Sequence, residues 1–151
     1  MKLKDVIPWG RNLKEYKSMF NLNDHDLINN KILDVAGGPS SFNYEVTKIS
    51  GKVVSIDPIY QFTEKEIEQR IKETSYIISE QIKKNKEKFV WKNIKNPEEL
   101  IKIRLEAMKL FINDYENGLS EKRYVFGMLP NLPFEDNSFD LVLSSHFLIF
   151  I

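Results

Sequence analysis

Residues 31–42 read KILDVAGGPSSF, a short apolar segment that runs into a pair of glycines and then into a helix start. The apolar run at 31–36 predicts a buried strand, and apolar residues then recur at helical spacing until Gly51 provides a stop. A second strand, KVVSID, follows at 52–57. Strand, helix and strand within about thirty residues predict a right-handed βαβ unit with two parallel strands.

The remaining segments extend this unit on both sides. Residues 13–20 have the spacing of a short helix, and residues 21–30, which contain an exposed His25, are expected to form caps and turns. The charged stretch 62–121 predicts a helical insertion of two long helices that are separated at Asn96-Pro97. The residues expected on one apolar face of each helix are Ile67, Ile71, Ile78 and Ile82 in the first helix, and Leu100, Ile103, Ala107, Phe111 and Tyr115 in the second.

Two further strands are expected after the insertion, at RYVFG (residues 123–127) and from Phe139-Asp140 onward. The predicted fold class is α/β, a Rossmann-like parallel sheet flanked by helices, with the insertion between strands 2 and 3. Residues 1–151 are expected to form a single, partial domain.

The composition is that of an ordinary globular protein, with 42% hydrophobic and 29% charged residues and a net charge of zero. Because 22 basic residues balance 22 acidic ones, nucleic-acid binding is not expected, and the lysines at 83–88 are expected to be a solvated helix end. The sequence has no cysteine, no signal-peptide pattern and no run that approaches a membrane span. A cytoplasmic location is therefore expected.

The loop between the first strand and its helix lacks the G-x-G-x-x-G spacing of a dinucleotide site. Asp34 at its entrance would repel a diphosphate and attract a ligand that carries an ammonium group. Asp57 ends the second strand, where an acid can accept hydrogen bonds from both hydroxyls of a ribose. A nucleoside joined to a cationic amino acid satisfies both acids. The competing interpretations are that Gly37 and Gly38 serve a tight turn and that Asp57 is a plain strand-end residue.

Three pieces, ILDVAGG, IDP and LPFEDNSFDLVLSSHF, together resemble the class I S-adenosylmethionine-dependent methyltransferases. The resemblance implies that the first loop binds the amino-acid end of S-adenosylmethionine, that Asp57 binds its ribose, and that Met128 lies near its adenine. Ala36 and Ser40 stand where the family more often has glycine. The cofactor-binding residues that the resemblance implies are Asp34, Ala36, Gly37, Gly38, Pro39, Asp57, Pro58, Met128, Leu129 and Ser145.

The methyl acceptor is less defined by the sequence. His146 follows the fourth strand and is a weak candidate for a general base, for which a structural or merely ligand-adjacent histidine is the commoner role. Arg11 and Tyr16 could close over the carboxylate of the cofactor, but a solvated arginine and a packed tyrosine are the favoured interpretation. Ser144-Ser145-His146-Phe147 stands where amino-group methyltransferases carry N-P-P-Y, so a small-molecule acceptor is favoured. No metal is expected.

The last residues, LVLSSHFLIFI, are apolar almost throughout. In the strand order 3-2-1-4 that the resemblance implies, this strand would form an exposed sheet edge, which is prone to aggregate unless another chain or a second copy covers it. A truncated methyltransferase with weak or no activity in isolation is therefore expected. The alternative function is a non-catalytic or decayed Rossmann-like nucleoside-binding module that needs a partner chain.

Overall fold

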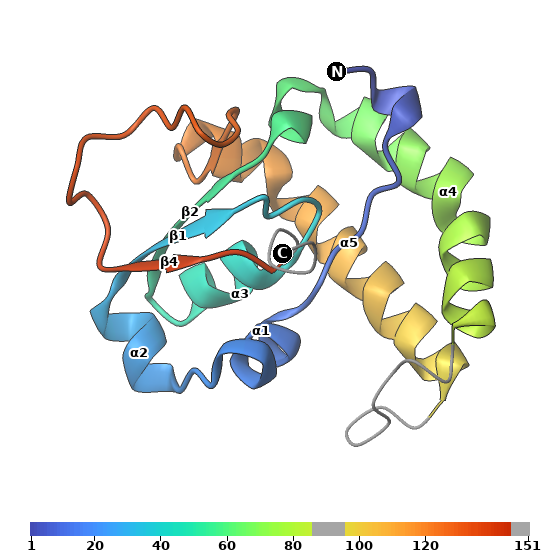
Figure 1. Cartoon of the computed structure of the whole chain (residues 1–151), viewed down its shortest axis with the longest axis horizontal. Helices are drawn as coiled ribbons and strands as arrows, with labels where there is room; N and C mark the ends of the chain where they lie inside the picture. Colours follow the sequence, from blue (N-terminus) through green and yellow to red (C-terminus); the bar gives the residue numbers. More distant parts are fainter. Residues whose placement is uncertain (86–95, 146–151) are drawn as a thin grey trace.

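The computed structural model describes residues 1–85 and 96–145, and its centre is a four-stranded parallel sheet (Figure 1). The spatial order β3-β2-β1-β4 confirms the predicted Rossmann-like α/β fold. The strands are β1 (Lys31–Val35), β2 (Lys52–Ile56), β3 (Tyr124–Val125) and β4 (Leu141–Leu143). Parallel strands require crossovers, which here are α3 (Phe42–Lys48) between β1 and β2 and the helical insertion between β2 and β3.

The segment before the sheet forms a short 3-10 helix, η1 (Leu3–Asp5), and two α-helices, α1 (Leu13–Phe20) and α2 (Asp24–Asn29). The helix predicted at 13–20 is confirmed. The caps expected at 21–30 are confirmed, since Asn21 ends α1 and Asn23 forms a reciprocal capping box with Asp26. The helix α2 that starts there was not predicted, and Leu27 anchors it in the core. His25 is exposed, as expected, although it lies on this helix.

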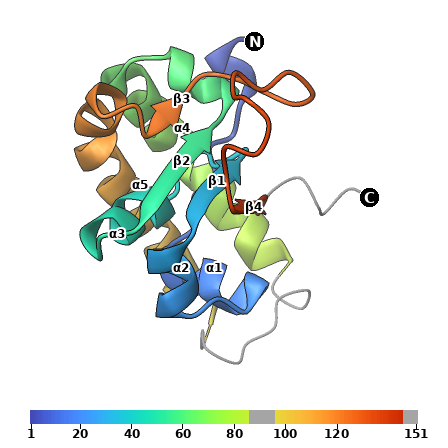
Figure 2. The same ribbon diagram turned by 90° about the vertical axis from the view of Figure 1, so that its left-hand side faces the viewer.

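The two faces of the sheet are covered differently. Ile32 and Val53 point toward α1, α2 and α3 and pack with Tyr16 and Phe42, whose rings stack at 4.0 Å. The opposite face of β1 and β2 is covered by the connection between β3 and β4 (Figure 2), which contributes Leu132, Phe134 and Phe139. At the β4 edge this cover ends, and Val142 is 60% exposed.

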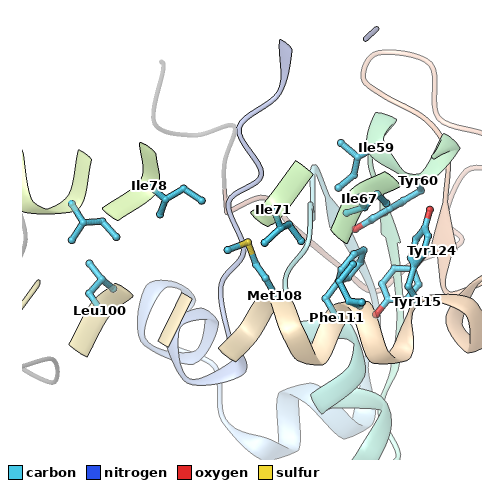
Figure 3. Packing of buried hydrophobic residues seen from close by; sticks show 12 residues of the cluster. Ile59, Tyr60, Ile67, Ile71, Ile78, Leu100, Met108, Phe111, Tyr115 and Tyr124 are labelled. Carbon is cyan, nitrogen blue, oxygen red and sulfur yellow. The ribbon is translucent and has the colours of Figure 1, made fainter. Parts of the chain in front are cut away.

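The insertion consists of α4 (Glu64–Lys84) and α5 (Pro97–Ser120), which pack side by side. Thr63 and Asn96 cap their first turns. The stripe predicted in α4 is buried, and Figure 3 shows how its isoleucines meet the apolar face of α5 and the aromatic cluster of Tyr60, Phe111, Tyr115 and Tyr124. Within residues 1–85 and 96–145, no helix is long and apolar enough to cross a membrane.

The predicted face of α5 is confirmed at Leu100, Ala107, Phe111 and Tyr115, and the buried face is wider than predicted. Ile103 is half-buried, while Arg104 and Met108 are buried beside Leu100 and Phe111. The additional burial follows from the N-terminal segment: a Cβ at Gly10 would overlap the Pro39 carbonyl group and lie 2.9 Å from Met108 Cγ, so the backbone of Gly10 packs closely on both. Residues 8–11 are therefore held between α5 and the loop that follows β1.

The lysine cluster predicted at 83–88 is described in part. Lys83 and Lys84 are exposed in the last turn of α4, where the helix dipole favours cations, and the rest of the cluster lies outside the described residues.

Gly118 in α5 tests the packing of the insertion on the sheet. A Cβ at this position would overlap the ring of Tyr124 on β3. Replacing an internal helical glycine by alanine ordinarily stabilises a helix by about 1 kcal/mol, whereas overpacking a core costs about 1–3 kcal/mol or more. We expect Gly118→Ala to lower the free energy of unfolding, measured by urea denaturation. Asn113→Ala, an exposed change in the same helix, is the control and should be neutral or slightly stabilising.

Candidate functional site

The loop after β1 has the backbone that the sequence leads one to expect of a ligand-binding turn. Ala36 and Gly38 have positive φ angles of 56° and 57°. The amide groups of Ala36 and Gly37 both donate to the carbonyl oxygen of Ile56, at 2.8 and 3.3 Å, and so hold the loop over the end of β2. Ala36 occupies a left-handed conformation that glycine would adopt without strain.

Asp34 lies beneath this loop and is 1% exposed. The Tyr16 hydroxyl donates to its Oδ1 at 2.9 Å, and the Ser55 hydroxyl donates to its Oδ2 at 2.8 Å. Burial raises the pKa of Asp34 to about 7, against the two hydrogen bonds, which lower it. A Cβ at Gly37 would overlap this carboxylate, so the first glycine of the pair is needed for close approach. Asp34 is therefore covered by the loop and is not exposed for direct contact with a ligand.

Asp57 stands at the end of β2 and is 9% exposed. Its Oδ2 accepts the N–H of Gly38 at 2.9 Å, and its Oδ1 accepts the N–H of Ile59 at 2.9 Å. Burial raises the pKa of Asp57 to about 6, although both hydrogen bonds lower it. A loop amide that a phosphate would need is thus already bound to a protein carboxylate. Each carboxylate oxygen keeps a second lone pair, which can accept a hydroxyl donor.

The two acids are close enough for the charge of Asp57 to raise the pKa of Asp34. Both lie at the carboxyl ends of adjacent strands, as predicted, and neither forms an ion pair among the described residues. Tyr60 completes the surroundings, because its hydroxyl donates to the carbonyl oxygen of Gly38 at 2.8 Å. The loop is therefore fixed by hydrogen bonds to the end of β2 and to the residues that follow this strand.

A chain of buried polar groups continues from Asp34 across the sheet. Asn43 donates to Ser55 Oγ at 3.0 Å and accepts from Arg123 Nη1 at 2.7 Å. Arg123 in turn makes a bidentate pair with Asp114 on α5, at 2.7 and 2.8 Å. This series of hydrogen-bonded side chains joins the first loop to the insertion.

The other predicted cofactor-binding residues also lie near the carboxyl ends of the strands. Pro39 is buried in the loop, and Pro58 starts the 3-10 helix η2 (Pro58–Gln61). Met128 is 58% exposed and Leu129 is exposed beside it; the preceding Gly127 lies against Ile56 at the end of β2, so this connection passes near Asp57. Ser145 is buried. His146, the candidate base, lies outside the described residues. Among the described residues, no group of three acidic or histidine side chains could hold a metal ion.

The structure confirms the prediction for Tyr16 but not the prediction for Arg11. Tyr16 is fully buried, which confirms a packed tyrosine, and its hydroxyl accepts from Ser145 Oγ at 3.0 Å. The expectation of a solvated arginine is wrong. Arg11 is half-buried, and its Nη1 donates to the carbonyl oxygen of Ser145 at 3.0 Å, because the N-terminal segment is packed against the loop.

Several polar residues of the site were not predicted from the sequence, namely Asn43, Ser55, Arg104, Asp114 and Arg123. Ser55 carried a usable signal, since it is a hydroxyl residue within an otherwise apolar strand and faces the same side as Asp34. Arg104 gave no such signal, because a charged residue in a lysine- and glutamate-rich helix is ordinarily solvent-exposed.

Fold and site together define a Rossmann-like α/β protein with two acids beneath and beside its first loop. No family model matches the chain, and no solved structure matches it. The chain is similar to the protein named Uncharacterized protein MJ0045 of Methanocaldococcus jannaschii, with 39% identity over 150 residues. The alignment covers 99% of this chain and 66% of that protein, so the chain spans just under two thirds of the length of its relative.

Ala36 offers a test of the loop conformation. We expect Ala36→Gly to raise the free energy of unfolding by about 0.5–1 kcal/mol, because it removes the strain of a left-handed alanine. The same substitution at Ala107, buried within α5, is the control and should lower it by about 1 kcal/mol or more. Urea denaturation of both variants measures the two effects, and a loss of stability in Ala36→Gly would contradict the strain.

Asp34 should make stability dependent on pH. Its pKa is raised from 3.8 to about 7, so between these pH values the folded chain binds more protons than the unfolded chain. The free energy of unfolding should therefore fall as the pH rises through this window, by an amount on the order of 2–4 kcal/mol. Urea denaturation across the window should show a much smaller slope for Asp34→Asn, with a remainder of the same sign from Asp57. Asp140 lies at the opposite end of the strands, beside Lys31 at the start of β1. The Asp140→Asn variant should therefore keep the full dependence of the free energy of unfolding on pH.

Proposed function

We propose that the chain is the cofactor-binding portion of an S-adenosylmethionine-dependent methyltransferase whose acceptor is a small molecule. The observation that carries this proposal is the placement of Asp57 at the end of β2, where it bonds the glycine loop and keeps lone pairs free for a ribose. The loop amide of Gly38 is already bound to this carboxylate, which disfavours a diphosphate and therefore a dinucleotide.

The charges of the site suit the other end of this cofactor as well. S-adenosylmethionine carries a sulfonium and an ammonium group, and the loop stands over Asp34, a carboxylate that is partly ionised near neutral pH. The exposed Met128 and Leu129 beside the end of β2 offer apolar contact for an adenine ring. A nucleoside bound in this way would extend from the connection after β3 toward the loop after β1.

Methyl transfer itself asks for positioning, because the sulfonium of the bound cofactor is a good leaving group. The residues of this chain would hold the ribose at Asp57 and the amino-acid end along the loop, and they would exclude water through the N-terminal segment 8–11. His146 remains the candidate for removing a proton from the acceptor. We place the protein in the cytoplasm, as its cysteine-free composition suggests.

The second candidate function is a non-catalytic nucleoside-binding module that acts with a partner chain or a second copy. The observation that favours it is the open side of β4, where Val142 is 60% exposed and the described residues leave the sheet uncovered. The two candidates differ in whether S-adenosylmethionine binds in preference to a plain nucleoside.

Binding of S-adenosylmethionine by isothermal titration calorimetry tests the proposal. We expect saturable binding that Asp57→Asn weakens by about 10- to 100-fold, because hydrogen bonds from the ribose to a charged acceptor are lost. Asp140→Asn is the matched control. The Asp140 carboxylate also accepts a backbone N–H, that of Lys31, but it lies at the opposite end of the strands from Asp57. Saturable adenosine binding without preference for S-adenosylmethionine would favour the second candidate, and no binding of either would refute both.

A further inference from the structure

Two arginines, Arg11 and Arg104, lie near one carboxylate, that of Glu15. Glu15 pairs with Arg104, and burial lowers the pKa of Arg11 while the charge of Glu15 raises it. Arg104 on α5 is 4% exposed, and its Nη1 bonds Oε2 of Glu15 on α1. Its guanidinium lies over the ring of Trp9 at 4.9 Å, which holds its plane in place. The Nε of Arg104 is buried without a hydrogen-bond partner among the described residues.

The charge of this cluster is not balanced. Burial lowers the pKa of Arg104 to about 10, and the nearby charge of Arg11 lowers it further, while Glu15 raises it. The other oxygen of Glu15 is used by the backbone N–H of Asn12 in the capping box of α1. Two cations therefore face one anion in a largely buried place, an arrangement that a second anion would stabilise.

Arg123 shows what a fully partnered arginine looks like in this protein. Its guanidinium bonds Asp114 bidentately and also bonds Asn43 and Glu121, so each of its three nitrogens has a partner. A purely structural role for Arg104, tying α5 to α1 through Glu15, accounts for its Nη1 alone. Its Nε has no hydrogen-bond partner within residues 1–85 and 96–145, so this donor is available to a ligand.

The cluster of Arg11, Arg104 and Glu15 lies apart from the place proposed for the ribose. Arg11 donates its backbone N–H to Ser40 Oγ at 3.0 Å and its side-chain Nη1 to the Ser145 carbonyl at 3.0 Å. The cluster therefore lies beside the glycine loop, near the carboxyl end of β4, whereas Asp57 stands at the end of β2, beyond the central strand β1. Ligands of open α/β sheets bind outside the carboxyl ends of the strands.

We propose that Arg11 and Arg104 form a binding site for an oxyanion group, a carboxylate or phosphate, of the molecule that accepts the methyl group. Guanidinium groups match the planar or tetrahedral arrangement of such oxygens, and Trp9 pre-orients one of them. The oxyanion site stands on the arginines alone, while its assignment to the acceptor rests on the proposed function. The acceptor is accordingly an anionic small molecule.

The site is tested without any cofactor, by titrating inorganic phosphate into the ¹⁵N-labelled protein near neutral pH. We expect saturable shifts of the Nε–H resonance of Arg104, with that of Arg123 unmoved as an internal control. Arg11→Gln should weaken phosphate binding by about tenfold, and Lys72→Gln, which removes an exposed cation on α4, should leave the affinity unchanged. Absence of a saturable shift, or equal effects of the two variants, would overturn the site.

Glu15→Gln provides a gain of function that a loss of folding cannot imitate. Removing the internal carboxylate leaves both arginines without an anion, so phosphate should bind several-fold more tightly to this variant. Weaker or unchanged binding in a folded Glu15→Gln protein would mean that Glu15 does not compete with the ligand, which would overturn the site.

The source of the oxyanion is decided by comparing two nucleosides. S-adenosylhomocysteine carries the carboxylate of the cofactor, and 5′-methylthioadenosine lacks it. We expect Arg11→Gln to leave the affinities of both unchanged; a loss confined to S-adenosylhomocysteine would assign the arginines to the cofactor and overturn the acceptor assignment. If neither nucleoside binds the wild type, the proposed function and the acceptor assignment fail together, whereas the phosphate titration still decides the oxyanion site.

Discussion

The buried carboxylate of Asp34 is the constraint around which the edge of the sheet is organised. A carboxylate in this position is stable only if hydroxyl or amide donors surround it, and Tyr16 and Ser55 supply them from α1 and β2. Those donors are themselves fixed, Tyr16 by stacking on Phe42 and Ser55 by Asn43. One acid thus sets the positions of a helix, a neighbouring strand and the loop above it.

The loop is consequently held mainly by protein groups. Asp57 and Tyr60 bind the amide and the carbonyl group of Gly38, and the N-terminal segment packs against Pro39 from the other side. A pre-formed loop of this kind loses little conformational entropy when a ligand binds. Its own hydrogen bonds also limit the ligand, because a group that requires the Gly38 amide must displace a carboxylate.

The elements of the fold follow from local sequence patterns, and the polar network does not. Apolar runs, apolar residues at helical spacing and caps were enough to predict the strands and the insertion, and the two acids were found because each ends a strand. The order of the strands was expected from the family resemblance. Asn43, Arg104 and Arg123 escaped because their partners are distant in sequence: Arg123 meets Asn43 across 80 residues, and Arg104 meets Glu15 across 89. Side-chain pairs of such separation leave no periodic trace.

The central position of β1 has a consequence for how the chain folds. Its partner β4 aligns Ile32 with Leu141, so the sheet is completed by a parallel contact between residues far apart in the chain. Closing such a loop costs entropy before any strand contact repays it, which makes non-local parallel sheets slow to form. During synthesis, β1 can therefore pair only with β2 until β4 has been made. The second edge of β1 stays unpaired until then.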